Sequence, residues 1–483
     1  MIYPVITKIK EFLLVNKTER QTVAKNTLWL TVSNIGGRLI RAIVIIYAAR
    51  ILGASDWGAF SYAISLVALI TIFTDLGVGP TLTREISKNA RDQEYFIRLL
   101  STSFYIKLGL LAIGILLMLF VLPHFVSIPA VNLILPIITL VLIFDTLRDF
   151  GVSLVRAMEK MEVEAGLFIL TNIAILISGV IFLFYRPTLE SFALAYTMGT
   201  GFGMVVTLVV LRKDLTGIFT GFDPKLVKLI FVSALPFAIS SVLGGLMINT
   251  DILMLGFFRS AEEVGFYSAT QRLIQILYLL PLVLASGIFP LLSRLANRDM
   301  AKFRDTLERV LGFTFLLATP IIAGGIILAE PIIRLTFGAE YLPAVMSFQI
   351  LLFTLAITFS AAILTNAVFA YNKQRNLVIF SILGVTTNAL LDFFLIQRWG
   401  INGSAYATLI AQLLSNIYLW YVMKRINYFK VTDRLPRILI AGAFMTGVTL
   451  LLSSLEINFM INILISGLVY VGALFAQREP LLQ

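Results

Sequence analysis

The chain has no cysteine and a single histidine among its 483 residues. Without cysteine it has neither disulfides nor thiolate metal sites. His124 lies in a predicted loop beside Pro123, so neither a Ser-His-Asp triad nor a histidine metal cluster can be assembled around it. The Gly-rich phosphate loop of ATP-driven proteins is also absent. These absences exclude most hydrolases, metalloenzymes and ATP-driven pumps, and the protein is not expected to be an enzyme.

Charged residues are scarce as well. They make up 13% of the chain, against about 25% in a typical soluble domain, whereas hydrophobic residues make up 59%. The apolar runs are long enough to cross a bilayer, which takes roughly 20 residues. The sequence therefore predicts an all-α polytopic membrane protein with fourteen transmembrane helices, near 27–50, 57–78, 103–122, 131–154, 164–184, 190–211, 227–250, 264–290, 307–329, 343–369, 376–396, 401–423, 435–454 and 458–476.

Long loops are missing too, which leaves no room for a soluble catalytic domain between the spans. Before the first span, Ile2, Ile6, Ile9 and Leu13 recur at helical spacing among lysines. This pattern predicts an amphipathic helix over residues 1–24 that lies on the cytoplasmic membrane surface. The segment lacks the compact apolar core of a signal peptide, so it is not expected to be cleaved.

Basic residues are plentiful and unevenly distributed, and they give the chain a net charge of +11. With the N-terminus in the cytoplasm, 28 of the 38 basic residues fall in cytoplasmic segments and only five fall outside. The positive-inside rule therefore predicts a multi-pass protein of the cell membrane with both termini cytoplasmic. The charges are spread loop by loop and not gathered in one patch, which argues against a nucleic-acid partner.

The transmembrane plan occurs twice. Three segments recur in the same order at offsets of 207–213 residues: ARILGASDWGAFSYA at 49–63 with GFFRSAEEVGFYSAT at 256–270, RAMEK at 156–160 with FAYNK at 369–373, and Gly36-Gly37 with Gly244-Gly245. Six spans, an even number, separate the copies, so both insert with the same orientation. Parallel repeats with a substrate site at their interface are a transporter design.

The repeat predicts how the chain is divided. We expect an interfacial helix, two six-helix halves around a central cavity and an added helix pair, at 1–24, 25–215, 216–426 and 427–483. The first helix of each half contains a glycine pair, and the second copy also contains Pro236. These residues either let the two helices bend during a transport cycle or reflect the frequency of Gly and Pro in membrane helices.

Arginines within the spans are the main functional signal. A charge at the bilayer centre costs about 2.5–3.5 kcal/mol on insertion scales, so it faces the bundle interior or a water-filled cavity. Asn34, Arg38 and Arg41 share one helix face. Arg272 lies in the eighth span beside Gln271 and Gln275.

These side chains predict the chemistry of the substrate. Guanidinium groups stay charged and offer paired donors to phosphate oxygens. We therefore expect Arg38, Arg41 and Arg272 to bind a diphosphate, with Asn34, Gln271 and Gln275 as polar lining. The alternative is that the arginines pair internally with carboxylates.

Other ionisable residues are expected to support the site. Asp145, Arg148 and Asp149 are spaced for local ion pairs and, with Asp75, are predicted to form a salt-bridge network or inner gate. Lys107 either snorkels to the cytoplasmic edge or faces the cavity. Asn388 lies one turn from Asp392, near the outer end of a span, as Asp251 does. A cation site there is a weaker alternative.

Several strings resemble a known family. AARILGASDWGAFSYA at 48–63, TDLGVGPTLTREISK at 74–88 and RAMEKMEVEA at 156–165 are similar to the polysaccharide transporter branch of the multidrug/oligosaccharidyl-lipid/polysaccharide exporter superfamily. That branch includes O-antigen and exopolysaccharide repeat-unit flippases. The resemblance covers nearly the whole chain.

The resemblance implies a flippase that moves undecaprenyl-diphosphate-linked oligosaccharide from the cytoplasmic to the outer leaflet. It implies alternating access through a cationic cavity. Related lipid II flippases use arginines in the first and eighth helices, which here contain Arg38, Arg41 and Arg272. Expected partners are the lipid-linked oligosaccharide, membrane lipids and other polysaccharide-assembly membrane proteins. No cofactor is expected, and a coupling ion, Na+ or H+, is left open.

Three rival functions follow from the same features. A lipid II flippase shares the fold and the charge pattern. A cation-coupled multidrug exporter would need functional carboxylates in its cavity, which the arginines argue against. A membrane polysaccharide polymerase or ligase would be expected to have a large outer loop with catalytic basic residues, and the short connections argue against it.

Overall fold

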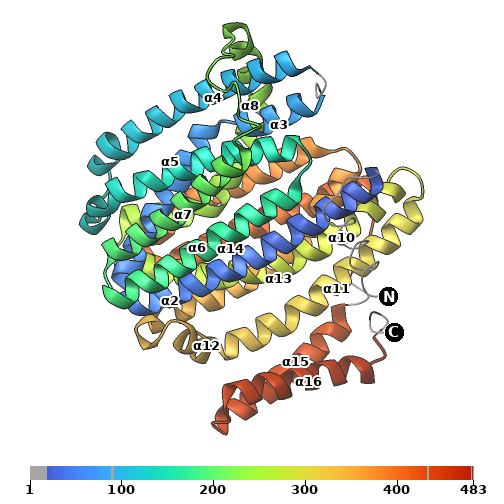
Figure 1. The fold of residues 1–483 in the computed structure, drawn as a ribbon. Helices are drawn as coiled ribbons and strands as arrows, with labels where there is room; N and C mark the ends of the chain where they lie inside the picture. The colour runs from blue at the N-terminus through green and yellow to red at the C-terminus, as the bar shows by residue number, and fades with distance from the viewer. Residues whose placement is uncertain (1–18, 89–91, 432–434, 480, 482–483) are drawn as a thin grey trace, which may run out of the picture. The chain divides into compact units, whose positions relative to one another are not determined.

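A computed structural model describes residues 19–88, 92–431, 435–479 and 481, and within these residues all regular structure is helical (Figure 1). The predicted surface helix falls mainly on residues 1–18, outside the described residues, and stays a prediction. The main helices are α2 (Glu19–Asp75), α3 (Val78–Lys88), α4 (Gln93–Leu116), α5 (Pro129–Ala157), α6 (Met161–Tyr185), α7 (Leu189–Leu211), α8 (Pro224–Phe258), α9 (Ala261–Leu277), α10 (Leu279–Leu295), α11 (Met300–Ile327), α12 (Ala329–Thr336), α13 (Val345–Ala370), α14 (Gln374–Ile426), α15 (Leu435–Ser454) and α16 (Phe459–Ala476).

Three short helical turns complete the described elements. A π-helical turn (η1, Leu117–Val121) and a 3-10 turn (η2, Leu122–His124) end the α4 span, and a 3-10 turn (η3, Ala339–Ala344) precedes α13. His124 therefore lies in a turn at a helix end, as the sequence predicts.

The prediction of fourteen crossings is confirmed. The described residues contain 12 helical segments that are long and apolar enough to span a membrane, and two of these, 51 and 53 residues long, are far longer than one crossing needs. In α2 the backbone leaves helical geometry at Gly53 (φ 77°), and in α14 it does so at Gly400 (φ 54°). A positive φ is tolerated by glycine, so each long helix turns back there and crosses twice.

Helix starts follow from local sequence. Five helices begin at a Ser, Thr, Asp or Asn whose side-chain oxygen accepts a backbone N–H of the first turn: Asp92, Thr188, Ser260, Asp299 and Asn458. The break between α9 and α10 falls at Tyr278, three residues before Pro281. Proline has no backbone N–H to donate, so a helix restarts readily around it.

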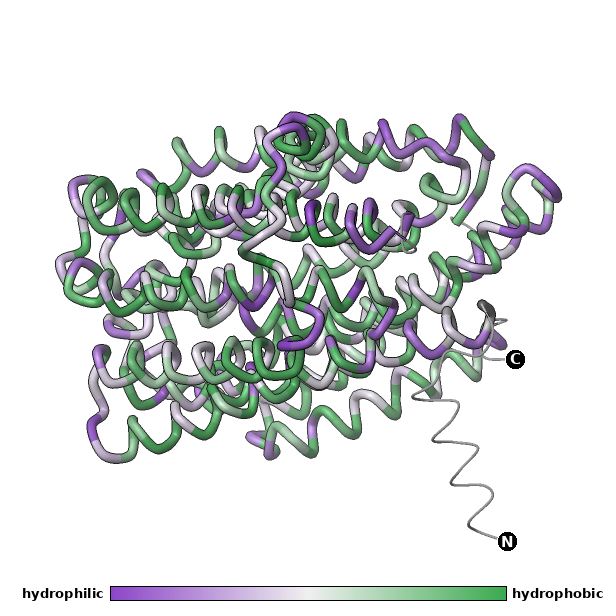
Figure 2. The backbone as a smooth tube through the Cα atoms, turned by 45° about the horizontal axis from the view of Figure 1, so that its top comes forward, coloured by the Kyte–Doolittle hydropathy of each residue, from purple (hydrophilic) through white to green (hydrophobic). Residues whose placement is uncertain are grey.

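The chain forms two compact units, Met1–Asn249 (unit 1) and Thr250–Gln483 (unit 2), and the division falls within α8. In unit 1, α6 packs against α2 and α7, while α5 packs against α2, α3 and α7. In unit 2, α13 packs against α10, α11 and α14, and the pair α15–α16 packs against α11 (Figure 1). The tube in Figure 2 is largely hydrophobic along the helices, with hydrophilic residues concentrated at their ends.

The glycine pairs of the repeat are alike in structure as well. A Cβ on Gly37 would collide with Phe168, and a Cβ on Gly245 would collide with Ile72. Gly36 and Gly244 have no atom within 4 Å of that position. The second glycine of each pair therefore allows close helix packing, which is a reason for these residues other than bending.

Candidate functional site

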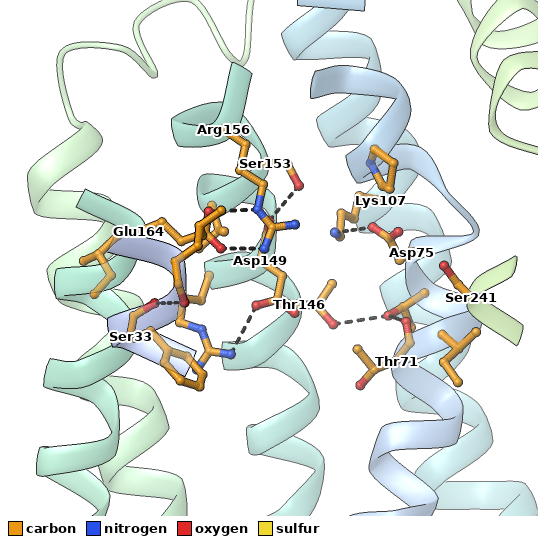
Figure 3. Close-up of a pocket in the computed structure, with 18 of the residues that line it drawn as sticks. Ser33, Thr71, Asp75, Lys107, Thr146, Asp149, Ser153, Arg156, Glu164 and Ser241 are labelled. Carbon is orange, nitrogen blue, oxygen red and sulfur yellow. Dashed lines mark hydrogen bonds and ion pairs between the residues drawn. The ribbon is translucent and has the colours of Figure 1, made fainter. Parts of the chain in front are cut away.

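Unit 1 contains a polar cavity of about 810 Å3 among its membrane-spanning helices (Figure 3). Hydroxyl and amide side chains line much of it, and Phe168 adds an aromatic ring. Ser241 reaches it from α8, Lys107 from α4, and most other groups from α2, α5 and α6. The polar lining residues are Ser33, Asn34, Thr71, Thr74, Asp75, Lys107, Thr146, Arg148, Asp149, Ser153, Arg156, Glu164 and Ser241.

Every cation that lines this cavity is paired with a carboxylate. Lys107 is 3% exposed, and its Nζ lies 2.7 Å from Asp75 Oδ1. Arg156 donates to both carboxylate oxygens of Glu164 at 2.8 and 2.5 Å. Figure 3 shows these two pairs on opposite sides of the cavity.

The third cation, Arg148, lies between two carboxylates of its own helix. Its guanidinium is 2.8 Å from Asp145 and 3.1 Å from Asp149. The local ion pairs expected from the spacing are thus present, and their role as a gate stays a prediction. The lining contains Lys107, Arg148 and Arg156 against Asp75, Asp149 and Glu164, so it is balanced in charge and not cationic.

The predicted diphosphate ligands of unit 1 lie outside that lining. Arg41 Nε donates to Asn172 Oδ1 at 3.0 Å, and its guanidinium is 6.0 Å from the ring centre of Phe168, a residue of the cavity wall. Arg38 is exposed, and within the described part of the chain it makes no hydrogen bond or ion pair. Asn34 does line the cavity, and its amide donates to Leu30 O at 2.7 Å.

Arg272 belongs to unit 2. It is half-buried on α9, and its Nη1 donates to Gln275 Oε1 at 3.0 Å, with Gln271 one position earlier on the same helix. Arg272 and Gln275 are therefore in contact on one face of α9. The diphosphate-binding role of Arg38, Arg41 and Arg272 stays a prediction.

Unit 2 contains a second polar cluster, which we call the carboxylate pocket. Its members are Asp251, Tyr267, Asn388, Asp392 and Thr408. Asp251 accepts from Tyr267 at 2.5 Å, from Thr408 at 2.8 Å and from Asn388 at 3.0 Å. These donors come from α9 and from both arms of α14, so the fold assembles the pocket from distant parts of the chain.

The second carboxylate of the pocket is less well satisfied. Asp392 is 0% exposed and lies beside Asp251 and Ser404. Neither of its carboxylate oxygens has a hydrogen-bond partner among the described residues. Within that same part of the chain, neither carboxylate of the pocket makes an ion pair. Two adjacent buried carboxylates without a basic partner are stabilised by a bound cation or by protonation.

Sequence reasoning identified some residues of the carboxylate pocket and of the unit 1 cavity, and missed others. The spacing of Asn388 and Asp392 was visible, but their meeting with Asp251 and Tyr267 depends on helix packing. Arg156 and Glu164 were not singled out, although charges eight residues apart across a predicted turn could have suggested the pair. Lys107 does not snorkel to the edge, because Asp75 pairs with it inside the bundle.

Comparisons with known proteins agree with this fold. Residues 23–296, more than half of the chain, match the model of a family described as polysaccharide biosynthesis protein. A protein of Shigella flexneri named as an O-antigen transporter is 22% identical over 419 residues, which cover 84% of this chain and 98% of the relative. A Haloferax volcanii protein named as a low-salt glycan biosynthesis flippase is 24% identical over 396 residues, covering 82% of each chain.

A solved structure shows the same architecture. The lipid II flippase MurJ in an inward closed conformation superposes with a TM-score of 0.81 at 20% sequence identity, covering 94% of this chain and 100% of that one. At this identity the likeness establishes the fold, a transporter-type helical bundle.

Proposed function

We propose, because this chain belongs to the polysaccharide biosynthesis protein family, that it is a flippase for a lipid-linked oligosaccharide. Its substrate would be an undecaprenyl-diphosphate sugar, moved from the cytoplasmic to the outer leaflet by alternating access. The observation that carries the proposal is the polar cavity of about 810 Å3 inside the membrane-spanning helices of unit 1. Polar groups at membrane depth are costly and mark substrate pathways.

The lining of the cavity suits a sugar. Six hydroxyl groups, from Ser33, Thr71, Thr74, Thr146, Ser153 and Ser241, can exchange hydrogen bonds with a glycan. Phe168 offers an apolar face to a sugar ring. The paired charges add both donors and acceptors without a net charge, so we assign this cavity to the glycan and not to the diphosphate.

The diphosphate is assigned to Arg38 and Arg41, with Arg272 of unit 2 as a third predicted ligand. Arg38 has no carboxylate partner in the described residues, and Arg41 uses its Nε on Asn172, which leaves further guanidinium donors available. Guanidinium groups bind phosphate oxygens in pairs. The polyprenyl tail would stay in the surrounding lipid.

The carboxylate pocket is the proposed site of a coupling cation, Na+ or H+. Asp251 and Asp392 supply negative charge, and Asn388, Thr408 and Tyr267 supply neutral oxygens around it. Hard monovalent cations favour such oxygen ligands. A cation bound there would relieve the repulsion between the two carboxylates.

The alternatives differ in what they would transport. A drug exporter needs a free carboxylate for a cationic drug, whereas each lining carboxylate of the unit 1 cavity is next to a basic partner. A lipid II flippase would differ in its glycan. A polymerase would change the substrate covalently.

Purified protein in proteoliposomes separates these functions. Three substrates are compared: an undecaprenyl-diphosphate oligosaccharide, lipid II and a lipophilic cationic drug. The proposal expects movement of the first without chemical change. Preferential movement of lipid II or of the drug, or formation of a longer glycan, would contradict it.

A further inference from the structure

The second arm of α14 carries a polar stripe through unit 2. Ser404, Thr408, Gln412 and Asn416 follow one another at intervals of four residues, so they lie along one face of the helix. The stripe extends about 18 Å at 1.5 Å per residue. Three apolar side chains flank Gln412 and Asn416 in the sequence and point elsewhere on the helix: Leu413, Leu414 and Ile417, which are 47–56% exposed.

Neighbouring helices complete the stripe with more neutral oxygens. Thr358 on α13 donates to Gln412 Oε1 at 3.1 Å, and Asn416 donates to Ser360 at 3.1 Å. At the break between α9 and α10, the Tyr278 hydroxyl lies 2.7 Å from Thr354 and beside Gln412. No basic or acidic side chain is among these groups.

The stripe connects the carboxylate pocket with the basic end of α14. At one end Thr408 donates to Asp251 at 2.8 Å, and Ser404 lies beside Asp392. At the other end, Asn416 is two helical turns from Lys424, on the side that the positive-inside rule predicts to be cytoplasmic.

Within the described part of the chain, buried oxygens without a hydrogen-bond partner occur at both ends of the stripe. They include the two carboxylate oxygens of Asp392 and the hydroxyl of Ser404 at one end, and Oδ1 of Asn416 at the other. Buried polar atoms are nearly always satisfied by protein or by water. Between these ends, Thr408, Gln412, Thr358 and Tyr278 are only half-buried, so the middle of the stripe is partly accessible, whereas Ser404 and Asn416 are buried.

We propose that the polar stripe is a hydrated route by which a small cation reaches the carboxylate pocket from the basic end of α14. The inference rests on the proposed cation site but concerns a separate property, access by water. Neutral oxygens suit such a route, because they can replace part of the hydration shell of a cation without trapping it as a carboxylate would.

The absence of cysteine from the chain makes water access directly measurable. Single variants Gln412→Cys and Asn416→Cys, with Leu413→Cys and Leu414→Cys as controls on the exposed apolar face of the same helix, are reconstituted and treated with a charged methanethiosulfonate. Only a thiolate in contact with water reacts. The stripe positions should react at least about tenfold faster than the controls.

Thr358→Cys repeats the test from the opposite wall, in case replacement of Gln412 or Asn416 prevents folding. Reaction at Thr358→Cys as slow as at Leu413→Cys, in protein that elutes as a folded species, would overturn the route. Equal reaction at the stripe and control positions would overturn it as well.

A second measurement uses 22Na+ as the probe with full-length protein. Gln412→Leu should slow 22Na+ association about tenfold and leave equilibrium binding unchanged, because it raises a barrier without removing a ligand. Weaker binding at an unchanged rate would make Gln412 a ligand and contradict the route. Absence of 22Na+ binding in the wild type would instead contradict a Na+ site, while the thiol labelling would still decide whether the route exists.

Discussion

The unit 1 cavity and the carboxylate pocket of unit 2 both lie within membrane-spanning helices, yet they hold charge in opposite ways. In the cavity, Lys107, Arg148 and Arg156 each lie next to a carboxylate. In the pocket, Asp251 and Asp392 lie beside each other among neutral donors. The charges of the cavity are neutralised by its own side chains, whereas the negative charge of the pocket needs a positive charge from outside.

The difference indicates that the two regions bind different ligands, the cavity a glycan and the pocket a cation. A balanced, hydroxyl-rich cavity can accept a glycan without binding every passing ion, because its charges already satisfy one another. A buried pocket with two carboxylates and no basic side chain favours a bound cation, because uncompensated buried charge is costly. Variants of the two sites test this comparison, and the largest effect is expected in the carboxylate pocket.

Removing both pocket charges should abolish cation binding. Asp251→Asn with Asp392→Asn should weaken 22Na+ binding more than about 100-fold, since even outer-shell partners of a bound metal are worth about 10–100-fold. Asp305→Asn, which removes a carboxylate of an exposed i,i+4 pair, is the matched control. Equal binding by the double variant and the control would remove the pocket from the account.

Breaking a buried pair of the cavity should destabilise unit 1. Lys107→Met leaves Asp75 without its partner, and the free energy of unfolding should fall by about 3 kcal/mol, the lower end for buried pairs because Asp75 is 24% exposed. Denaturant unfolding in detergent measures the change. Arg334 and Glu330 form an exposed ion pair, which serves as the comparison. Arg334→Met should lower the free energy of unfolding by at most about 1 kcal/mol. Equal losses would show that the cavity pairs are not buried in solution.

Tyr267→Phe tests whether the hydroxyl of Tyr267 orients Asp251 for cation binding. The hydroxyl donates to Asp251 Oδ2 at 2.5 Å, and a hydrogen bond to a charged group contributes about 1.5–3 kcal/mol. Loss of this orienting contact should change cation affinity by roughly tenfold or more, while the ring keeps its packing. Isothermal titration with NaCl would report it, and an unchanged Kd would assign Tyr267 to packing alone.

The smallest effect is expected at a neutral contact of the cavity. The hydroxyls of Thr74 and Thr146 are 3.2 Å apart, so Thr74→Val should lower the free energy of unfolding by about 1 kcal/mol. The same unfolding assay applies. A loss as large as that of Lys107→Met would mean that hydroxyls, and not ion pairs, dominate the stability of the cavity.

Sequence reasoning predicted the spans because membrane insertion depends on local hydropathy. It also predicted the contacts of Arg148 with Asp145 and Asp149, since these residues share one helix. It could not predict the pairing of Lys107 with Asp75 or of Asn388 with Asp251, because these contacts depend on how distant helices pack. For the same reason it did not reveal that the cations of the unit 1 cavity, Lys107, Arg148 and Arg156, each lie beside a carboxylate. A count of arginines does not reveal which of them already have partners.

The central claim is that an anionic lipid-linked sugar crosses the membrane with the help of Arg38 and Arg41. The most direct test is the translocation of a labelled undecaprenyl-diphosphate oligosaccharide in proteoliposomes by three proteins. These are the wild type, the double variant Arg38→Gln with Arg41→Gln, and a control with two exposed arginines replaced, Arg309→Gln with Arg334→Gln. The account predicts transport by the wild type and the control, and its loss in the first variant although that protein is folded. Unchanged transport without Arg38 and Arg41 would contradict it.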